Sequence, residues 1–478
     1  MFVNRQQELT FLNNLLTTES RRLSQLILLY GRRRVGKTLL LRHWLQQTAI
    51  TSTYWAAEKE NAPLQRRKFY ARLLGVAGNQ APIFDSWGDL WESAANLLGS
   101  KRHIIVLDEL PYAAESDSAM LSALQHAWDQ HFQDSQCIFI LCGSHVRIME
   151  TLMTRQSPLF GRMTGQWHLE PLAFATLQAF FPNWSAEERV AAYAIAGGIP
   201  AYLEWMQPQR SLVENIRHVI LAPSSMFIAE PQFLLYDEVR DPQTYLSILK
   251  AIGAGHRALS EISNASLVGK THLTAYLKTL QQLRLVERRI PVTVPPAQRR
   301  KSRQGRYHLK DPYFRFYFRF LDPYQDILTL EPERVLDSVR SGLGAFVGQS
   351  AFELLAQEWV RQQGRVGQLP FRPDAVGSHW SRSVQVDVVA INWEDKQILL
   401  GECKWTQAPI DRNIVRELIE QKQAKVISGL PGGHDDWTVS HVFFSRNGFT
   451  DAARTYAQSH NALLVDLKRL DTDLTEKQ

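Results

Sequence analysis

The stretch GRRRVGKT, from Gly31 to Thr38, constrains the fold of this chain more than any other feature. It matches G-x-x-x-x-G-K-[ST], in which two glycines let the backbone turn tightly and point its N–H groups at phosphate oxygens. Lys37 would reach the outer phosphates, and Thr38 would offer its hydroxyl to a magnesium ion. The apolar run Leu26–Tyr30 indicates a buried strand before the loop, and Leu39–Leu45 indicates a helix after it. We therefore expect a phosphate-binding turn between a strand and a helix.

A second marker follows in HIIVLDEL, an apolar run that ends in Asp108 and Glu109. A magnesium-dependent nucleoside triphosphatase needs one carboxylate to hold the hydrated metal, here Asp108, and one to orient the attacking water, here Glu109. A third apolar run, Cys137–Leu141, leads to Ser144. The Ser144 hydroxyl either senses the γ-phosphate or only shapes a turn.

Four predicted strands alternate with helical segments, namely Leu26–Tyr30, Thr53–Ala57, Ile104–Leu107 and Cys137–Leu141. This alternation predicts an α/β fold with a parallel sheet covered on both faces, over residues 1–215. The carboxyl ends of such strands share one edge, where α/β sheets bind ligands. We assign ATP and Mg²⁺ binding at that edge to Gly31, Val35, Gly36, Lys37, Thr38, Leu39, Asp108 and Ser144.

The same region resembles the archaeal-type AAA-related P-loop ATPases. The resemblance is carried, in the family's order, by FVNRQQEL, GRRRVGKT, IIVLDELPY, LCGSHV, SPLFGR and GGIPAYL. It implies an AAA-like P-loop domain with a helical lid, a segment at Arg5 and Glu8 near the base, and a lid contact at GGIPAYL. It also implies that Arg162 stabilises phosphoryl-transfer charge, in cis or in trans. The alternative for Arg162 is a loop arginine without a catalytic role.

Composition excludes several classes of protein. The apolar content of 45% and charged content of 21% are those of a globular chain, and 478 residues are too many for one core. Three cysteines, Cys137, Cys142 and Cys403, are too few for a disulfide framework. No apolar run approaches the roughly 20 residues that span a bilayer, and the first residues lack the apolar core of a signal peptide. We expect a cytoplasmic protein without a membrane partner.

Positive charge is concentrated between Arg284 and Lys310, which hold nine Lys or Arg residues and one acid, against a net charge of +6 for the whole chain. The same stretch closes a pattern of three helices and two extended pieces over residues 235–320, which is typical of a winged helix-turn-helix. We assign DNA contacts to Lys270 and His272 on its third helix and to Arg299, Arg300, Lys301, Arg303 and Arg306 in the wing. The alternatives are a solvated loop, or a module that packs as a lid or binds protein.

Residues 340–470 combine a predicted helix, Phe346–Gln362, with two predicted strands, Gln385–Asn392 and Gln397–Lys404. A two-residue turn between the strands sets Asp387 directly opposite Glu402, so that two carboxylates meet on one face. Two carboxylates in contact repel each other unless a cation lies between them. Lys404 lies two residues further along the same face.

This D…E-x-K arrangement resembles the PD-(D/E)xK, or restriction-endonuclease-like, nucleases. The residues that carry it are VDVVAIN with Asp387, GECKW with Glu402 and Lys404, and FELL with Glu353; Val386 departs from the family's proline. The resemblance implies an α/β domain in which the three carboxylates bind Mg²⁺ and Lys404 assists cleavage of a phosphodiester.

Two functions follow from these patterns. The first is an ATP-regulated, DNA-binding, Mg²⁺-dependent nuclease with catalytic residues Lys37, Glu109, Arg162 and Lys404. The second is an ATP-dependent regulator whose C-terminal domain binds nucleic acid or protein without cutting. A ring-forming motor is less favoured, because no pore loop is evident. The sequence leaves open whether the chain forms a homo-oligomer.

Overall fold

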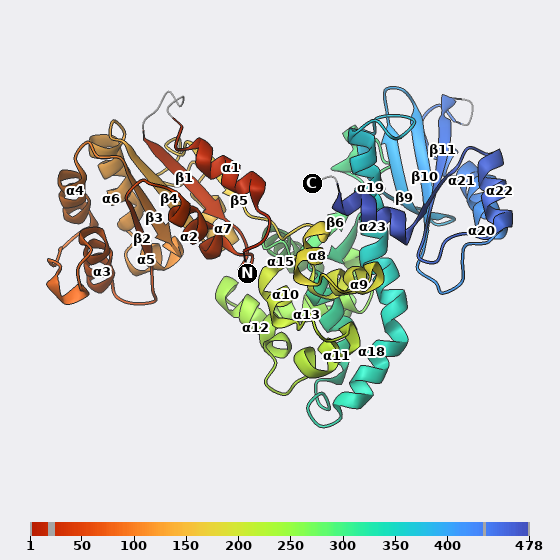
Figure 1. Ribbon diagram of the computed structural model, residues 1–478, viewed down its shortest axis with the longest axis horizontal. Helices are drawn as coiled ribbons and strands as arrows, with labels where there is room; N and C mark the ends of the chain where they lie inside the picture. Colours follow the sequence, from red (N-terminus) through yellow and green to blue (C-terminus); the bar gives the residue numbers. More distant parts are fainter. Residues whose placement is uncertain (1, 18–23, 434–435, 477–478) are drawn as a thin grey trace. The chain divides into compact units, whose positions relative to one another are not determined.

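The computed structural model describes residues 2–17, 24–433 and 436–476, and the chain divides into two compact units (Figure 1). The first comprises residues 1–172 and 199–201, and the second comprises residues 173–198 and 202–478. The predicted winged-helix segment and the C-terminal strands belong to the same unit. Within the described residues, no helix has the length and apolar character that crossing a membrane requires.

The first unit is built on a five-stranded sheet in the order β2-β3-β4-β1-β5, and all neighbouring strands are parallel. The strands are β1 (Gln25–Tyr30), β2 (Ser52–Ala56), β3 (His103–Asp108), β4 (Cys137–Gly143) and β5 (Gly165–His168). The helices are α1 (Gln6–Asn14), α2 (Lys37–Gln47), α3 (Ala62–Leu74), α4 (Trp87–Leu98), α5 (Leu110–Ser116), α6 (Met120–Ala127) and α7 (Val146–Thr151). The predicted parallel α/β sheet is confirmed.

Burial on both faces explains why these strands read as continuous apolar runs. Leu26 and Leu28 of β1 pack into a core with α3 to α7, whereas Ile27 and Leu29 pack into a second core with α1 and α2. The strand β5 was not predicted, because the short segment GQWH is polar and lacks an apolar period. It adds to the free edge of β1.

Strand order decides how the site is assembled. Because β4 lies between β1 and β3, its carboxyl end stands between the phosphate-loop motif and the acidic pair. Tyr30 pairs with Gly143, and Leu107 pairs with Leu141, so β1, β4 and β3 end within one residue of the same level. This arrangement brings Gly31, Asp108 and Ser144 to one edge, as predicted.

The second unit begins with a helical stretch. Its helices are α8 (Leu177–Phe180), α9 (Ala186–Ala196), α10 (Pro200–Trp205), α11 (Leu212–Asn215), α12 (Met226–Glu238), α13 (Pro242–Gly253), α14 (Leu259–Ser266) and α15 (Lys270–Gln282). The first two residues of α10 belong to the first unit. An antiparallel ribbon follows, made of β6 (Val286–Arg289) and β7 (Arg306–Leu309), with the short helix α16 (Pro296–Arg299) between them. Three helices and a ribbon therefore occur in the predicted order.

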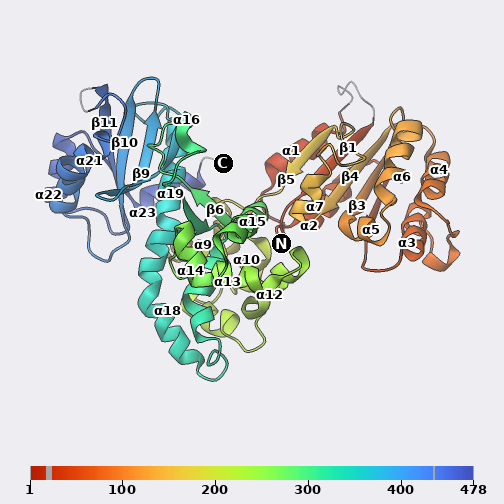
Figure 2. The same ribbon diagram turned by 180° about the vertical axis from the view of Figure 1, so that it is seen from behind.

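The loop between β6 and β7 is anchored to the C-terminal sheet (Figure 2). The Val292 N–H donates to the Ser378 carbonyl at 3.0 Å, and the Thr293 hydroxyl and His379 Nδ1 lie 2.7 Å apart. Val292 is buried in the apolar core of that sheet. The predicted wing is therefore a loop whose base is packed and whose tip alone is exposed.

The C-terminal sheet is mixed, in the order β12-β11-β10-β9-β8. The strand β9 (Gln385–Asn392) is antiparallel to both of its neighbours, β8 (Ala375–Trp380) and β10 (Gln397–Lys404). The strands β11 (Thr438–Ser445) and β12 (Leu463–Asp466) run parallel to β10. The helices are α17 (Pro312–Phe316), α18 (Pro332–Val347), α19 (Glu353–Arg365), α20 (Arg412–Arg416), α21 (Gln423–Ile427), α22 (Asp451–Ser459) and α23 (Leu467–Thr475).

Two π-helical turns interrupt the helices of this unit beside the predicted site. One, Gly348–Phe352, joins α18 to α19, so the predicted helix Phe346–Gln362 is the later part of a longer run that begins at Pro332. The other, Glu417–Lys422, joins α20 to α21. Turns of this kind rotate the following side chains out of the regular helical register, and they are frequent at functional sites.

Candidate nucleotide site and carboxylate pocket

The phosphate-loop motif adopts the conformation that its glycines permit. Gly36 has φ 96°, a left-handed conformation that strains any other residue, and a Cβ on Gly31 would stand 2.5 Å from the Leu169 carbonyl oxygen. Lys37 is buried, and its Nζ donates to the Gly31 and Arg32 carbonyls at 2.8 and 3.0 Å. The ammonium group is thus held against the loop where a phosphate would bind.

The two predicted magnesium ligands of the nucleotide site meet directly. The Thr38 hydroxyl donates to Asp108 Oδ2 at 2.8 Å, and the hydroxyl of Tyr54 on β2 donates to the same oxygen. Burial, and then the charge of Asp108, raises the pKa of Tyr54, which therefore remains a donor. Sequence reasoning missed Tyr54, which lies within the predicted strand Thr53–Ala57 and in the middle of β2. Oxygen donors of this kind fit a hydrated Mg²⁺ ion.

Glu109 and Ser144 form a second pair at the same edge. The Ser144 hydroxyl donates to Glu109 Oε1, and the Ser144 N–H donates to Glu109 Oε2 at 3.2 Å. Glu109 has φ 49°, a left-handed conformation that is costly for a residue with a side chain. The structure thus gives Ser144 a defined partner, the carboxylate predicted to orient water.

The remaining predicted residues of the first unit lie in three different settings. Arg5 donates to the Val35 and Glu170 carbonyls, at 2.9 and 2.8 Å, and so braces the loop from outside. Leu39 is exposed on α2. Arg162 forms a bidentate ion pair with Asp129, at 2.8 and 2.6 Å. A role for Arg162 at the γ-phosphate requires exchange of that partner and stays a prediction.

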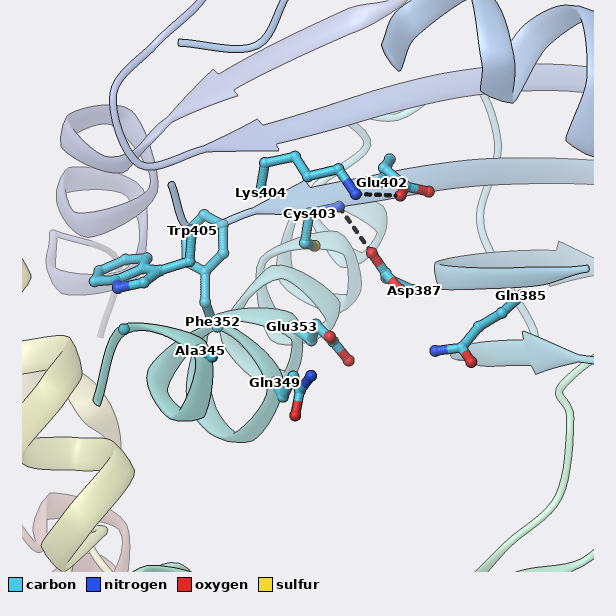
Figure 3. A pocket seen from close by; sticks show the side chains of 12 residues that line it. Ala345, Gln349, Phe352, Glu353, Gln385, Asp387, Glu402, Cys403, Lys404 and Trp405 are labelled. Atoms are coloured by element: carbon cyan, nitrogen blue, oxygen red, sulfur yellow. Dashed lines mark hydrogen bonds and ion pairs between the residues drawn. The ribbon is translucent and has the colours of Figure 1, made fainter. Parts of the chain in front are cut away.

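The predicted C-terminal residues share one pocket of about 300 Å³ (Figure 3). Glu353 comes from the start of α19, Asp387 comes from β9, and Glu402 and Lys404 come from β10. The remaining walls are formed by Gly344, Ala345, Gly348, Gln349, Phe352, Gln385, Cys403 and Trp405. Four side chains from three elements thus converge on one opening.

The predicted hairpin register is confirmed along β9 and β10, where Gln397 pairs with Asn392 and Gly401 pairs with Val388. The turn is wrong in length, because Trp393–Lys396 lie outside both strands and make a four-residue connection. The ladder ends one pair before Asp387 and Glu402. Asp387 Oδ2 instead accepts from the Cys403 N–H at 3.1 Å, which fixes that carboxylate beside β10.

Glu402 is almost fully buried and binds two lysines. Lys404 Nζ donates to its Oε1 at 2.8 Å, and Lys422 Nζ donates to its Oε2 at 2.9 Å. Burial opposes protonation of Lys404, but the hydrogen bond and charge of Glu402 outweigh it and raise the pKa of that lysine. Lys422 lies on the π-helical turn Glu417–Lys422, and no spacing in the sequence pointed to it.

The other two carboxylates hold protons more tightly than usual. Burial, and then the charge of Asp387, raises the pKa of Glu353 to about 8. Burial and the charge of Glu402 likewise raise the pKa of Asp387 to about 6. A bound cation would favour the charged forms of both carboxylates and so oppose these shifts.

Oxygen donors in this number suit a hard divalent cation. Among the described residues, however, no three His, Cys, Asp or Glu side chains are arranged to hold a metal ion. Both oxygens of Glu402 already accept from lysines, so this residue could coordinate only after one contact is exchanged. Glu353 and Asp387 are the carboxylates that fit a cation without such an exchange.

Some of the residues assigned to DNA contacts are exposed, and others are in contact with the rest of the fold. Lys270 and His272 are exposed on α15, whose Leu273 and Leu277 are buried. At the tip of the β6–β7 loop, the exposed side chains are Arg300, Lys301 and Arg303. Two others are engaged within the fold. Arg299 donates to the Val292 and Val294 carbonyls, and Arg306 lies over the Trp380 ring with 5.2 Å to its centroid.

Comparison with known families agrees with this geometry. Residues 2–206 match a family described as an ATPase domain predominantly from Archaea, and residues 317–426 match a family described as Archaea bacterial proteins of unknown function. An uncharacterised protein of Methanocaldococcus jannaschii is 33% identical over 408 residues, which are 85% of this chain and 88% of that protein.

The chain belongs to the family of this archaeal protein, and its first unit is a P-loop ATPase domain. An uncharacterised ATP-binding protein of the same organism is 48% identical over 50 residues, which are 10% of this chain and 80% of that protein.

Solved structures are more distant. A Walker-type ATPase of Pyrococcus abyssi is 20% identical with a TM-score of 0.46, and the match covers 66% of this chain and 96% of that one. The ORC1 protein of Aeropyrum pernix, solved in complex with DNA, is 16% identical with a TM-score of 0.35, covering 69% and 95%. Because both TM-scores are below 0.5, neither structure contributes to the family assignment.

Proposed function

We propose that this chain is an ATP-regulated nucleic-acid-binding protein whose C-terminal pocket cleaves phosphodiesters with Mg²⁺. The observation that carries the proposal is the convergence of Glu353, Asp387, Glu402 and Lys404 on one pocket. Carboxylates beside a lysine suit a reaction in which negative charge grows on a phosphate, because the ammonium group stabilises that charge. DNA is the nucleic acid that we favour.

Each side chain has a separate task in this scheme. Glu353 and Asp387 would hold the cation, which when bound activates water for attack on phosphorus. The Cys403 N–H orients the Asp387 carboxylate, and Gln357 Nε2 donates to the Asp387 carbonyl at 2.9 Å and fixes its strand. Lys404 would donate to the developing oxyanion after releasing Glu402.

Contact with nucleic acid would come from the three helices and the ribbon. Lys270 and His272 are exposed at the start of α15, where a recognition helix meets base edges. Arg300, Lys301 and Arg303 at the loop tip would neutralise phosphates, which provides affinity without sequence choice. ATP binding at the first unit would set when this contact forms.

A second function is favoured by one specific observation. Because Lys404 and Lys422 already neutralise Glu402, the pocket is electrostatically balanced on that side without a metal ion. A domain of this kind could bind a phosphate or a partner and never cut. In this alternative the protein is an ATP-dependent regulator.

Cleavage of plasmid and single-stranded DNA with Mg²⁺ separates the two functions. We expect the wild type to cut, and Lys404→Ala to lose about a hundredfold or more in rate, as for loss of a charge-stabilising donor. Lys422→Ala tests the second lysine, and Lys425→Ala is the matched control, because that side chain is exposed on α21.

The nuclease proposal fails if the wild type cuts neither DNA nor RNA, with or without ATP. Equal rates of cleavage by the wild type and Lys404→Ala would instead show that the pocket takes no part in the reaction. Binding of nucleic acid without cleavage would favour the alternative function, an ATP-dependent regulator.

A further inference from the structure

One face of the β6–β7 ribbon gathers positive charge. Arg289 pairs with Arg306 across the two strands, and Glu287 pairs with His308. Directly opposed side chains of an antiparallel pair share a face and stand about 5 Å apart, where like charges destabilise the sheet. Two arginines in opposed positions therefore cost stability unless an anion lies between or beside them.

Two further arginines join this face from neighbouring segments. The Arg257 carbonyl accepts from the Tyr307 N–H at 2.9 Å, and Arg257 Nη1 lies 3.1 Å from His308 Nδ1. Arg315 on α17 donates to the Ser350 carbonyl at 2.6 Å, and the charges of Arg289 and Arg257 act on it. We call these residues the arginine face: Arg257, Arg289, Arg306, His308 and Arg315.

The acid on this side of the ribbon is Glu287, which pairs with Arg289 at 2.6 Å. Four guanidinium groups gather around this carboxylate, while the charge of Arg306 also acts on Glu261 and that of Arg289 on Glu353. Burial, and then neighbouring arginines, lowers the pKa of Arg257 and lowers that of Arg315 to about 10. The arginines of the cluster therefore act on one another.

The arginine face also retains donors that the described residues leave unused. Because a guanidinium only donates, His308 Nδ1 must accept from Arg257, and the proton lies on Nε2. Burial, and then the surrounding arginines, lowers the pKa of His308 to about 2 and keeps it neutral. His308 Nε2 and Arg315 Nε are buried without a hydrogen-bond partner among the described residues. A buried donor without a partner is costly, so an acceptor is needed.

We propose that the arginine face binds a backbone phosphate of the nucleic acid that the protein engages. An oxyanion supplies acceptors and negative charge together, and planar guanidinium groups match phosphate oxygens. This inference rests on the proposed function for its choice of ligand. The charge of Arg289 also lowers the pKa of Glu353, so this arginine acts on the carboxylate pocket as well.

Binding is tested without cleavage, in full-length protein that carries Asp387→Asn and is kept free of Mg²⁺. Fluorescence anisotropy with a labelled DNA duplex is measured over a series of salt concentrations. We expect Arg306→Gln to weaken binding about tenfold and to reduce the slope of log K against log salt by about one. Arg340→Gln, an exposed arginine on α18, is the matched control and leaves both unchanged. Unchanged affinity and slope for Arg306→Gln would overturn the proposal.

Thermal melting distinguishes loss of a phosphate site from destabilisation of the fold. Arg306→Gln removes one repelling charge but also the contact with the Trp380 ring, so we expect its melting temperature without phosphate to stay close to that of the parent protein. Inorganic phosphate, at matched ionic strength, should stabilise the parent and not the variant. A lower melting temperature with full phosphate stabilisation overturns the site. Phosphate stabilisation without DNA binding overturns the choice of nucleic acid. DNA binding here, together with a wild type that does not cut DNA in Mg²⁺, counts only against the nuclease.

Discussion

At the scale of single residues, the nucleotide site is controlled by how Glu109 is held. Its backbone has a positive φ, and both oxygens of its carboxylate accept from Ser144, which directly follows β4. A strained residue of this kind persists only where surrounding contacts define it. The carboxylate predicted to orient water is therefore positioned by β4 and not by its own strand.

Replacement of Glu109 separates binding from hydrolysis. We expect Glu109→Gln to bind ATP with near-wild-type affinity and to hydrolyse it about 10²–10³-fold more slowly, because the amide cannot act as a base. Phosphate release and nucleotide binding measure the two effects. Glu115→Gln is the control, since that side chain is exposed on α5. Wild-type hydrolysis by Glu109→Gln would show that the assignment is wrong.

The carboxylate pocket makes stability depend on pH. The pKa of Glu353 is about 8 in the fold and 4.5 as its ordinary value, so the folded state binds more protons between these limits. Without metal, the free energy of unfolding should fall as pH rises through this window, by on the order of 1 kcal/mol per pH unit. Denaturant titrations at pH 5 and 8 measure it. Glu353→Gln should remove most of the slope, and an unchanged slope would contradict the buried carboxyl.

At the scale of elements, the loop between β6 and β7 is a structural connection with an exposed tip. Its base is hydrogen-bonded to β8, and Arg299 donates to two carbonyls of the same loop. Substitution of a basic residue at the base of this loop should therefore have a different effect from substitution at its tip.

Two variants distinguish the base of this loop from its tip. Arg299→Gln leaves the Val292 and Val294 carbonyls without that donor and should destabilise the second unit by about 1–2 kcal/mol. A triple variant, Arg300→Gln, Lys301→Gln and Arg303→Gln, should change stability by less than about 0.5 kcal/mol and weaken DNA binding. Chemical denaturation and anisotropy measure both. A destabilised triple variant, together with an Arg299→Gln variant of unchanged stability, would contradict this distinction between the base and the tip of the loop.

At the scale of the whole molecule, nucleotide binding and the carboxylate pocket belong to separate compact units. The residues of the nucleotide site come from the first unit, and the pocket and the arginine face come from the second. Coupling between them is part of the proposed function and follows from no single contact.

Calorimetry tests this division. A ligand stabilises the unit that binds it, so ATP with Mg²⁺ should raise one of two unfolding transitions, by about 2.7 kcal/mol at a hundredfold excess over its dissociation constant. Lys37→Ala should abolish ATP binding and with it the shift, while both transitions remain. A single transition that shifts as a whole would show that the two units unfold together.

Several elements were predictable because local patterns encode them. The phosphate loop, the strand ending in Asp108 and Glu109, and the β9–β10 register follow from glycine spacing, apolar period and strand alternation. Tyr54, Lys422 and the contact of Val292 with β8 were not predictable, because each depends on segments distant in sequence.

The sequence by itself determined which chemistry the chain carries, since a phosphate loop and an E-x-K strand need particular residue types at short spacings. Tertiary structure alone decided how those groups are held. The position of β4 between β1 and β3 brings Ser144 to Glu109, a π-helical turn carries Lys422 to Glu402, and cross-strand pairing opposes Arg289 and Arg306. These contacts arise from long-range packing, which a local periodicity cannot specify.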